Sequence, residues 1–133
     1  MAGEAKARQN IYPSLRYRDA KAAVEWLQEA FGFEERVVYE GDDGTIHHAE
    51  MRLGPGLIMF GSERPDRYGS HAGQSWLYVA VDDPAALFER ATAAGAEVVN
   101  ELHDTDYGSR DFSVRDPEGN LWSFGTYRPQ AER

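Results

Sequence analysis

One order of elements (strand, helix, strand, strand, strand) is predicted twice along this chain. The first copy comprises strands at 11–17, 33–39, 46–53 and 57–61, with a helix at 20–31 after the first strand. The second comprises strands at 76–81 and 96–102 and a closing strand pair within 110–127, with a helix that begins after Asp82 or Asp83. Gly32 follows Asp19 by thirteen positions, and Gly95 follows Asp82 by the same distance. Such a repeat predicts two similar half-domains, each a sheet with one helix on one face.

The closing strand pair carries the clearest turn signal in the chain. The run Asp116-Pro117-Glu118-Gly119 favours a type I turn, because proline sets φ at the second position and glycine accepts a positive φ on the way out. Apolar side chains alternate with small or polar ones on both sides of the turn; they are Phe112, Val114, Trp122 and Phe124. This period of two predicts a hairpin with one buried face.

Composition and charge exclude several classes of protein. The chain has 133 residues and a formal charge of −9, from 23 acidic and 14 basic residues, so we expect no nucleic-acid partner. It contains no cysteine, which excludes disulfides and thiolate sites. No apolar run approaches the length of a membrane span, and residues 1–10 lack the apolar core of a signal peptide. We therefore expect a soluble, cytoplasmic protein with no membrane partner.

The two modules, the helix that ends in Phe31-Gly32 and the DPEGN-aromatic hairpin resemble the vicinal oxygen chelate superfamily. This is the glyoxalase, bleomycin-resistance and extradiol dioxygenase group, and the resemblance covers residues 11–127. It implies an α+β fold in which two βαβββ modules form curled mixed sheets around a cup, usually in a homodimer. The expected organisation is a disordered tail at 1–10, modules at 11–62 and 75–127, a linker at 63–74 and a C-terminal tail at 128–133, all within one domain.

In the metal-dependent members of that superfamily, the resemblance implies four ligands from the first and fourth strands of each module. These ligands are usually His, Glu or Gln. The matching positions in this chain are Tyr12, Met59, Trp76 and Ser123. A phenol, a thioether, an indole and a hydroxyl are poor ligands for a divalent cation, which prefers carboxylate or imidazole. We therefore expect no metal site at these positions and assign no cofactor.

Strand alternation gives a list of residues that face the cup. The candidate ligand-binding residues are Tyr12, Ser14, Arg16, His48, Glu50, Met59, Trp76, Tyr78 and Ser123. An aromatic concavity with a few polar groups is typical of a small-molecule site. Tyr12, Trp76 and Tyr78 are suited to stack on a planar ligand or to hold a cation over their faces. The leading hypothesis is therefore a metal-free binding protein of the bleomycin-resistance type that sequesters an aromatic compound, neutral or cationic, in a dimer cup.

Other interpretations of the same residues stay open. The three aromatic side chains could fill a collapsed cup or a dimer seam, which would make the chain a ligand-free dimeric module. His48 and Glu50 could hold a divalent metal at a shifted site in a glyoxalase-like lyase or a dioxygenase, could act as a general base, or could form a solvated ion pair. Arg16 could bind a ligand carboxylate or pair with Glu50 or Asp111. No catalytic residue is assigned, and whether the chain is an enzyme is left open.

Overall fold

The computed structural model describes residues 9–130, across which the strands form two separate four-stranded sheets. The first module comprises β1 (Ser14–Tyr17), α1 (Ala20–Phe31), β2 (Glu34–Glu40), β3 (Ile46–Leu53) and β4 (Gly56–Ser62). The second comprises β5 (Trp76–Ala80), α2 (Pro84–Ala93), β6 (Glu97–Asp104), β7 (Arg110–Arg115) and β8 (Leu121–Gly125). The predicted α+β fold of two βαβββ modules is confirmed. Most of the predicted N-terminal tail and the last three residues of the C-terminal tail lie outside the described residues.

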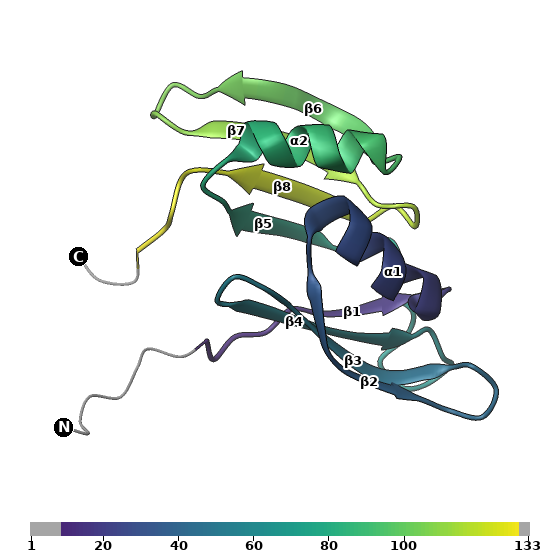
Figure 1. Cartoon of the computed structure of the whole chain (residues 1–133). Helices are drawn as coiled ribbons and strands as arrows, with labels where there is room; N and C mark the ends of the chain where they lie inside the picture. The colour runs from purple at the N-terminus through teal and green to yellow at the C-terminus, as the bar shows by residue number, and fades with distance from the viewer. Residues whose placement is uncertain (1–8, 131–133) are drawn as a thin grey trace.

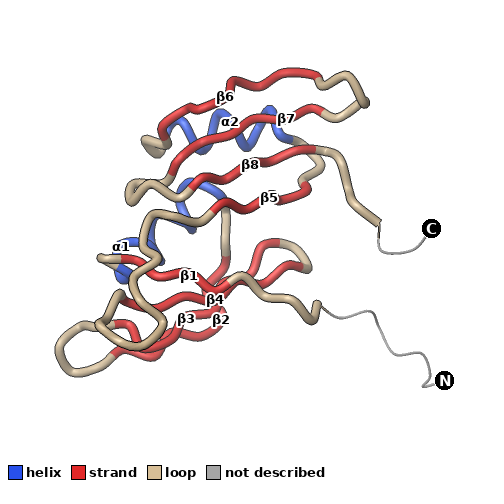
Figure 2. The backbone as a smooth tube through the Cα atoms, turned by 180° about the vertical axis from the view of Figure 1, so that it is seen from behind, coloured by secondary structure: helices blue, strands red, loops and turns tan. Residues whose placement is uncertain are grey.

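The two sheets have the same topology. Their strand orders are β1-β4-β3-β2 and β5-β8-β7-β6, so in each module the first strand pairs in parallel with the fourth. Both helices lie on the same side of the strands (Figure 1). The other side of both sheets is free of helix (Figure 2), and we call it the open face. In residues 9–130 no helix is long and apolar enough to span a membrane.

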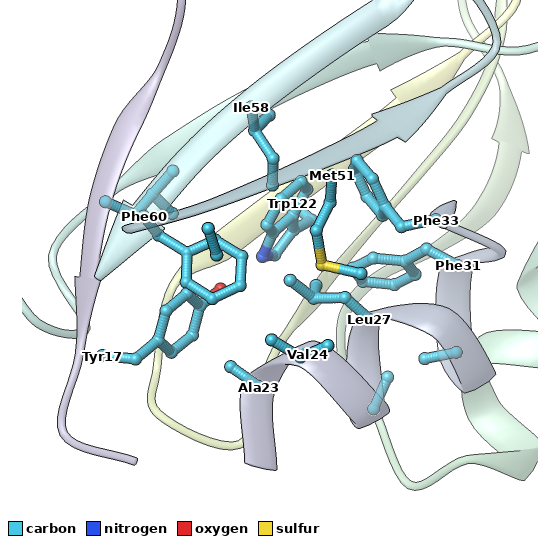
Figure 3. Close-up of a cluster of buried hydrophobic side chains, with 14 of the residues drawn as sticks. Tyr17, Ala23, Val24, Leu27, Phe31, Phe33, Met51, Ile58, Phe60 and Trp122 are labelled. Carbon is cyan, nitrogen blue, oxygen red and sulfur yellow. The ribbon is translucent and has the colours of Figure 1, made fainter. Parts of the chain in front are cut away.

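A single hydrophobic core joins the two modules on the helix side. The buried stripe of α1 comprises Ala20, Ala23, Val24, Leu27, Ala30 and Phe31, which fall on one face at helical spacing. The ring of Phe31 packs against Trp122 and Phe124 of β8, with ring centroids 5.2 and 4.8 Å apart. Figure 3 shows Phe31 and Trp122 in one cluster with side chains of the first sheet. The helix of the first module therefore also covers the sheet of the second.

Trp26, which lies off this stripe, joins the two helices. Its indole Nε1 donates a hydrogen bond of 3.0 Å to the main-chain oxygen of Ala94, and its ring meets Phe31 edge-on. Trp26 lies off the stripe because its hydrogen-bond partner belongs to the other module. The contact means that α1 and α2 hold each other in place within one chain.

Several element boundaries differ from the predicted ones for local reasons. β1 begins at Ser14 rather than at residue 11, and the preceding Pro13 contributes only its carbonyl, which accepts from the main chain of Met59. β6 continues to Asp104, so His103 lies in a strand and not in the predicted loop. The residues at the end of β6 do not alternate between polar and apolar, so the sequence pattern did not predict that the strand continues to Asp104. Of the two candidate caps of α2, Asp83 is the one whose side chain accepts from Ala86, at 3.1 Å.

The DPEGN turn does more than reverse the chain, because Asp116 is almost fully buried, with 4% of its surface exposed. Its Oδ2 accepts from the Tyr17 hydroxyl at 2.7 Å, the Asn120 amide at 3.0 Å and the Trp122 indole at 3.1 Å. Its Oδ1 accepts from the main-chain N–H groups of Glu118 and Asn120, each at 3.0 Å. Burial and the Asp116 carboxylate raise the pKa of the Tyr17 phenol, which keeps this donor protonated.

The next acidic residue of the turn fastens the start of α1. The Glu118 carboxylate accepts hydrogen bonds from the main-chain N–H groups of Arg18, at 2.6 Å, and Asp19, at 2.8 Å. A carboxylate at this position also interacts favourably with the positive end of the helix dipole. The turn of the second module therefore holds the strand-to-helix junction of the first.

We expect Asp116→Asn to lower the free energy of unfolding by about 2 to 4 kcal/mol, because a buried amide replaces an acceptor with a donor opposite the Tyr17 and Trp122 donors. Urea unfolding of the variant and the wild type measures this. The matched control is Asp42→Asn in the exposed turn between β2 and β3, for which we expect a change within about 0.5 kcal/mol. Equal stability of Asp116→Asn and the wild type would show that the turn does not join the modules.

Candidate functional site

The open face of the second sheet presents Trp76, Tyr78 and Ser123. The Trp76 side chain is 73% exposed, and its indole Nε1 donates a 3.0 Å hydrogen bond to the Ser123 hydroxyl. Ser123 is paired in register with Tyr78, and its oxygen lies 2.8 Å from the Ser113 hydroxyl. These contacts orient an exposed indole ring across small hydroxyl side chains. One broad apolar surface is thereby held in place and left accessible to a ligand.

The open face of the first sheet carries polar, charged, apolar and aromatic side chains on neighbouring strands. Met59 of β4 is the register partner of both Ser14 in β1 and Glu50 in β3. The Glu50 carboxylate lies 2.9 Å from His48 Nε2, and the Tyr39 ring stacks on the His48 ring at a centroid distance of 6.4 Å. The predicted residues Ser14, His48, Glu50 and Met59 are thus neighbours on one surface.

Arg16 is occupied by the linker that follows β4. Its guanidinium donates two hydrogen bonds to the Asp66 carboxylate, at 2.7 and 3.1 Å, and contacts the main-chain oxygens of Arg64 and Gly69. The partner is therefore Asp66 rather than Glu50 or Asp111. This hydrogen-bonded pair raises the pKa of Arg16 and lowers the pKa of Asp66. The pair fastens the linker to β1, at the edge of the first sheet.

Tyr12 lies just before β1, beside the first sheet. Its hydroxyl donates a 2.6 Å hydrogen bond to the main-chain oxygen of Gln9. The nine candidate residues therefore divide into a first-sheet set and a second-sheet set. Within the described chain no strand pairing joins the two sheets.

The donor set at the four superfamily positions does not suit a divalent cation. Two of the four, Trp76 and Ser123, hydrogen-bond to each other, and the Tyr12 hydroxyl is used by the main chain. Residues 9–130 contain no group of three or more His, Cys, Asp or Glu side chains that could hold a metal ion. His48 and Glu50 supply two such groups, fewer than the three protein ligands that catalytic zinc sites use.

The structure adds residues to the second-sheet set that the sequence analysis did not assign to the site. The Tyr78 hydroxyl donates a 2.6 Å hydrogen bond to the main-chain oxygen of Tyr127. Burial, followed by the nearby charge of Asp111, raises the pKa of Tyr78. Asp111 alternates with the core residue Phe112, so the same period-of-two argument places it on the open face. Tyr127 lies beyond the end of β8 and had no such signal.

Comparison with known proteins gives family and fold. A sequence model described as Glyoxalase/Bleomycin resistance protein/Dioxygenase superfamily matches residues 11–124. An uncharacterised protein of Mycobacterium tuberculosis strain H37Rv is 32% identical over 123 residues, which cover 86% of this chain and 72% of that protein. An uncharacterised protein of Mycobacterium bovis has the same identity, and the match covers 81% of its length.

Solved structures show the same architecture. TioX from Micromonospora sp. ML1 is 35% identical, with a TM-score of 0.75 over 90% of this chain and 100% of that one. UcmS2 is 20% identical, with a TM-score of 0.72 over 92% of this chain and 100% of that one. A glyoxalase I mutant from Zea mays is 18% identical, with a TM-score of 0.69 over 89% of this chain and 45% of that one. At these low identities, the last two matches show similarity of fold alone.

We expect Asp66→Asn to release the linker and to speed trypsin cleavage after the exposed Arg67 by about fivefold, because the bidentate contact with Arg16 is weakened. Limited proteolysis followed by mass spectrometry locates and times the cut. Asp104→Asn, which weakens a surface pair with Arg110 away from the linker, serves as the control. Identical cleavage rates in all three proteins would show that the Arg16–Asp66 pair does not restrain the linker.

Proposed function

Since the chain belongs to the Glyoxalase/Bleomycin resistance protein/Dioxygenase superfamily, we propose that it sequesters a small aromatic compound without the help of a metal ion. The ligand lies on the open face of the second sheet, with its planar part against Trp76. The protein acts as a cytoplasmic homodimer, and protection against a toxic compound such as an antibiotic is a role that this binding serves.

The observation that carries this proposal is the exposure of Trp76. Trp122 on the opposite face of the same sheet is fully buried, whereas Trp76 presents most of its ring to solvent. The indole N–H of Trp76 is hydrogen-bonded to Ser123. Covering on the order of 100 Å² of such a ring contributes roughly 2.5 kcal/mol to binding. An aromatic ligand would also gain from offset or edge-to-face stacking.

The division of the candidate residues between two open faces supports the dimer. A second copy of the chain that brings its first sheet opposite the second sheet would place Met59 and Glu50 across from Trp76. The resulting cavity would combine an apolar aromatic wall with a few polar groups, the usual composition of a ligand site. Size-exclusion chromatography with light scattering tests this part, and a monomer at micromolar concentration would contradict it.

We expect Trp76→Ala to weaken the binding of an aromatic ligand by at least about tenfold, while Trp76→Phe, which keeps a ring, stays within about threefold of the wild type. A thermal-shift screen of aromatic glycopeptide and quinone antibiotics identifies a ligand, and isothermal titration then compares the three proteins. A ligand that binds Trp76→Ala as tightly as the wild type would remove Trp76 from the site. A screen without any binder would favour the ligand-free module.

The contact between His48 and Glu50 favours a second candidate function, that of an enzyme. A carboxylate 2.9 Å from an imidazole orients the ring, which suits acid–base catalysis. The same pair is the place where a lyase or dioxygenase of this superfamily would hold a metal at a shifted site. Tyr39, stacked on the imidazole, would form one wall of such a site.

Elemental analysis of protein purified without a chelating tag separates the two candidates. For the metal-free binder we expect less than about 0.1 equivalent of Zn, Ni, Mn or Fe per chain, because structural and catalytic metals survive purification at near-stoichiometric levels. A stoichiometric metal that disappears in His48→Ala would favour the enzyme and contradict the metal-free proposal. His103→Ala, which changes an exposed histidine on the other sheet, is the matched control.

A further inference from the structure

Three tyrosine side chains and one carboxylate meet at the end of the open face of the second sheet. Tyr107, from the loop between β6 and β7, meets Tyr127 edge-on with ring centroids 5.8 Å apart. The Tyr107 hydroxyl donates a 3.3 Å hydrogen bond to Asp111 Oδ2, and Tyr78 is joined to the main chain of Tyr127. We call Tyr78, Tyr107, Tyr127 and Asp111 the tyrosine cage.

Small residues of the sheet make room for this cage. Across the open face, the register places Ala80 beside Gly125 and Gly125 beside Asp111. A Cβ atom at position 125 would collide with the Asp111 carboxylate and would lie 2.8 Å from the Tyr78 hydroxyl. The carboxylate and the Tyr78 phenol therefore both stand over a residue that has no side chain. The close approach requires glycine at this position.

The Asp111 carboxylate has no cationic partner within the described part of the chain. No Lys, Arg or His nitrogen from residues 9–130 lies within 4.0 Å of it. The nearby Arg110 pairs with Asp104 at 3.5 Å, and Arg128 pairs with Asp82 at 2.9 Å. His103, its register partner on β6, uses Nδ1 in a contact with the Glu101 main chain.

Neutral groups hold this carboxylate in place. The Ser109 hydroxyl, which is buried, donates to Asp111 Oδ1 at 2.5 Å and accepts from the main-chain N–H of Tyr127 at 3.0 Å. The half-buried Asp111 carboxylate thus lies beside the Tyr107 hydroxyl and close to the Tyr78 phenol. A carboxylate held close to a group of exposed tyrosine rings offers an ammonium group both a counter-charge and ring faces to contact.

We propose that the tyrosine cage binds the ammonium group of an organic cation, with Asp111 supplying the charge and the tyrosine rings the cation–π contacts. The inference deepens the proposed function and rests on it in one respect: the cation belongs to the ligand whose planar part covers Trp76. Trp76 and Ala80 are four residues apart on β5, or roughly 13 Å at the usual rise per residue. The ligand class is therefore an aromatic compound with an amine about 10 to 13 Å from its ring.

Choline and its neutral, isosteric analogue 3,3-dimethyl-1-butanol test the cage without requiring the natural ligand. We expect choline to bind the full-length protein in the millimolar range in an NMR titration and to shift the amide resonances of Asp111 and Tyr127. The neutral analogue should bind at least about tenfold more weakly, because it has the same shape and no charge. Equal binding of the two probes, or no binding of choline, would overturn the proposal.

Two variant sets assign the binding to the cage. Asp111→Asn should weaken choline binding by about tenfold or more, with an unfolding transition measured in parallel to confirm that the protein is folded. Tyr107→Phe, which keeps the ring, should retain binding within about twofold, whereas Tyr107→Leu should lose most of it. Full choline affinity in Asp111→Asn or in Tyr107→Leu would overturn the assignment.

The variant Trp76→Ala separates this inference from the proposed function. It should leave choline binding unchanged, since Trp76 lies outside the cage, while the binding of an aromatic ligand is lost. Choline binding that persists in a protein that binds no aromatic compound would keep the cage and remove the proposed function. If the protein binds an aromatic compound but does not bind choline, the proposed function stands and the cage is removed.

Discussion

The buried carboxylate of Asp116 is the interaction on which the arrangement of the two modules depends. A charge removed from water costs several kcal/mol unless hydrogen-bond donors surround it. Its donors come from β1, from the turn itself and from β8, so the charge is stable only when the first and second modules are in place together. Glu118 extends the same turn to the first N–H groups before α1. A hairpin of the second module thereby sets the position of the first helix.

This placement explains why one side of the molecule is closed and the other open. With its N-terminus held by the turn, α1 extends its C-terminal end over β8, where Phe31 completes the core of both sheets. The apolar faces of α1 and of both sheets pack against one another on that side. The aromatic residues of the open face, such as Trp76 and Tyr39, are therefore not part of a core, and they remain exposed in the single chain. Their exposure is the reason that we place the ligand and the second copy of the chain on this side.

The features that repeat along the sequence were predictable, and the features made by distant residues were not. Alternation correctly placed Phe112 and Val114 in the core and Ser123 on the opposite face, because a strand has only two faces. The bond between Tyr17 and Asp116 joins residues 99 positions apart, and the Arg16–Asp66 pair depends on the path of a polar linker. Neither has a periodic signature. Asp111 and Tyr78 were within reach of the alternation rule, but Tyr107 comes from a loop and Tyr127 lies beyond the end of β8.

The two open faces differ in what they have left to offer a ligand. On the first sheet the polar candidate residues already have partners, since His48 contacts Glu50 and Arg16 holds the linker. A ligand that displaced those partners would lose nearly as much as it gained, because an ion pair exchanged for another is close to neutral. On the second sheet, Asp111 has neutral donors and no counter-charge from the described residues. A chain with a formal charge of −9 also attracts cations overall, which is why we place the recognition of charge on the second sheet.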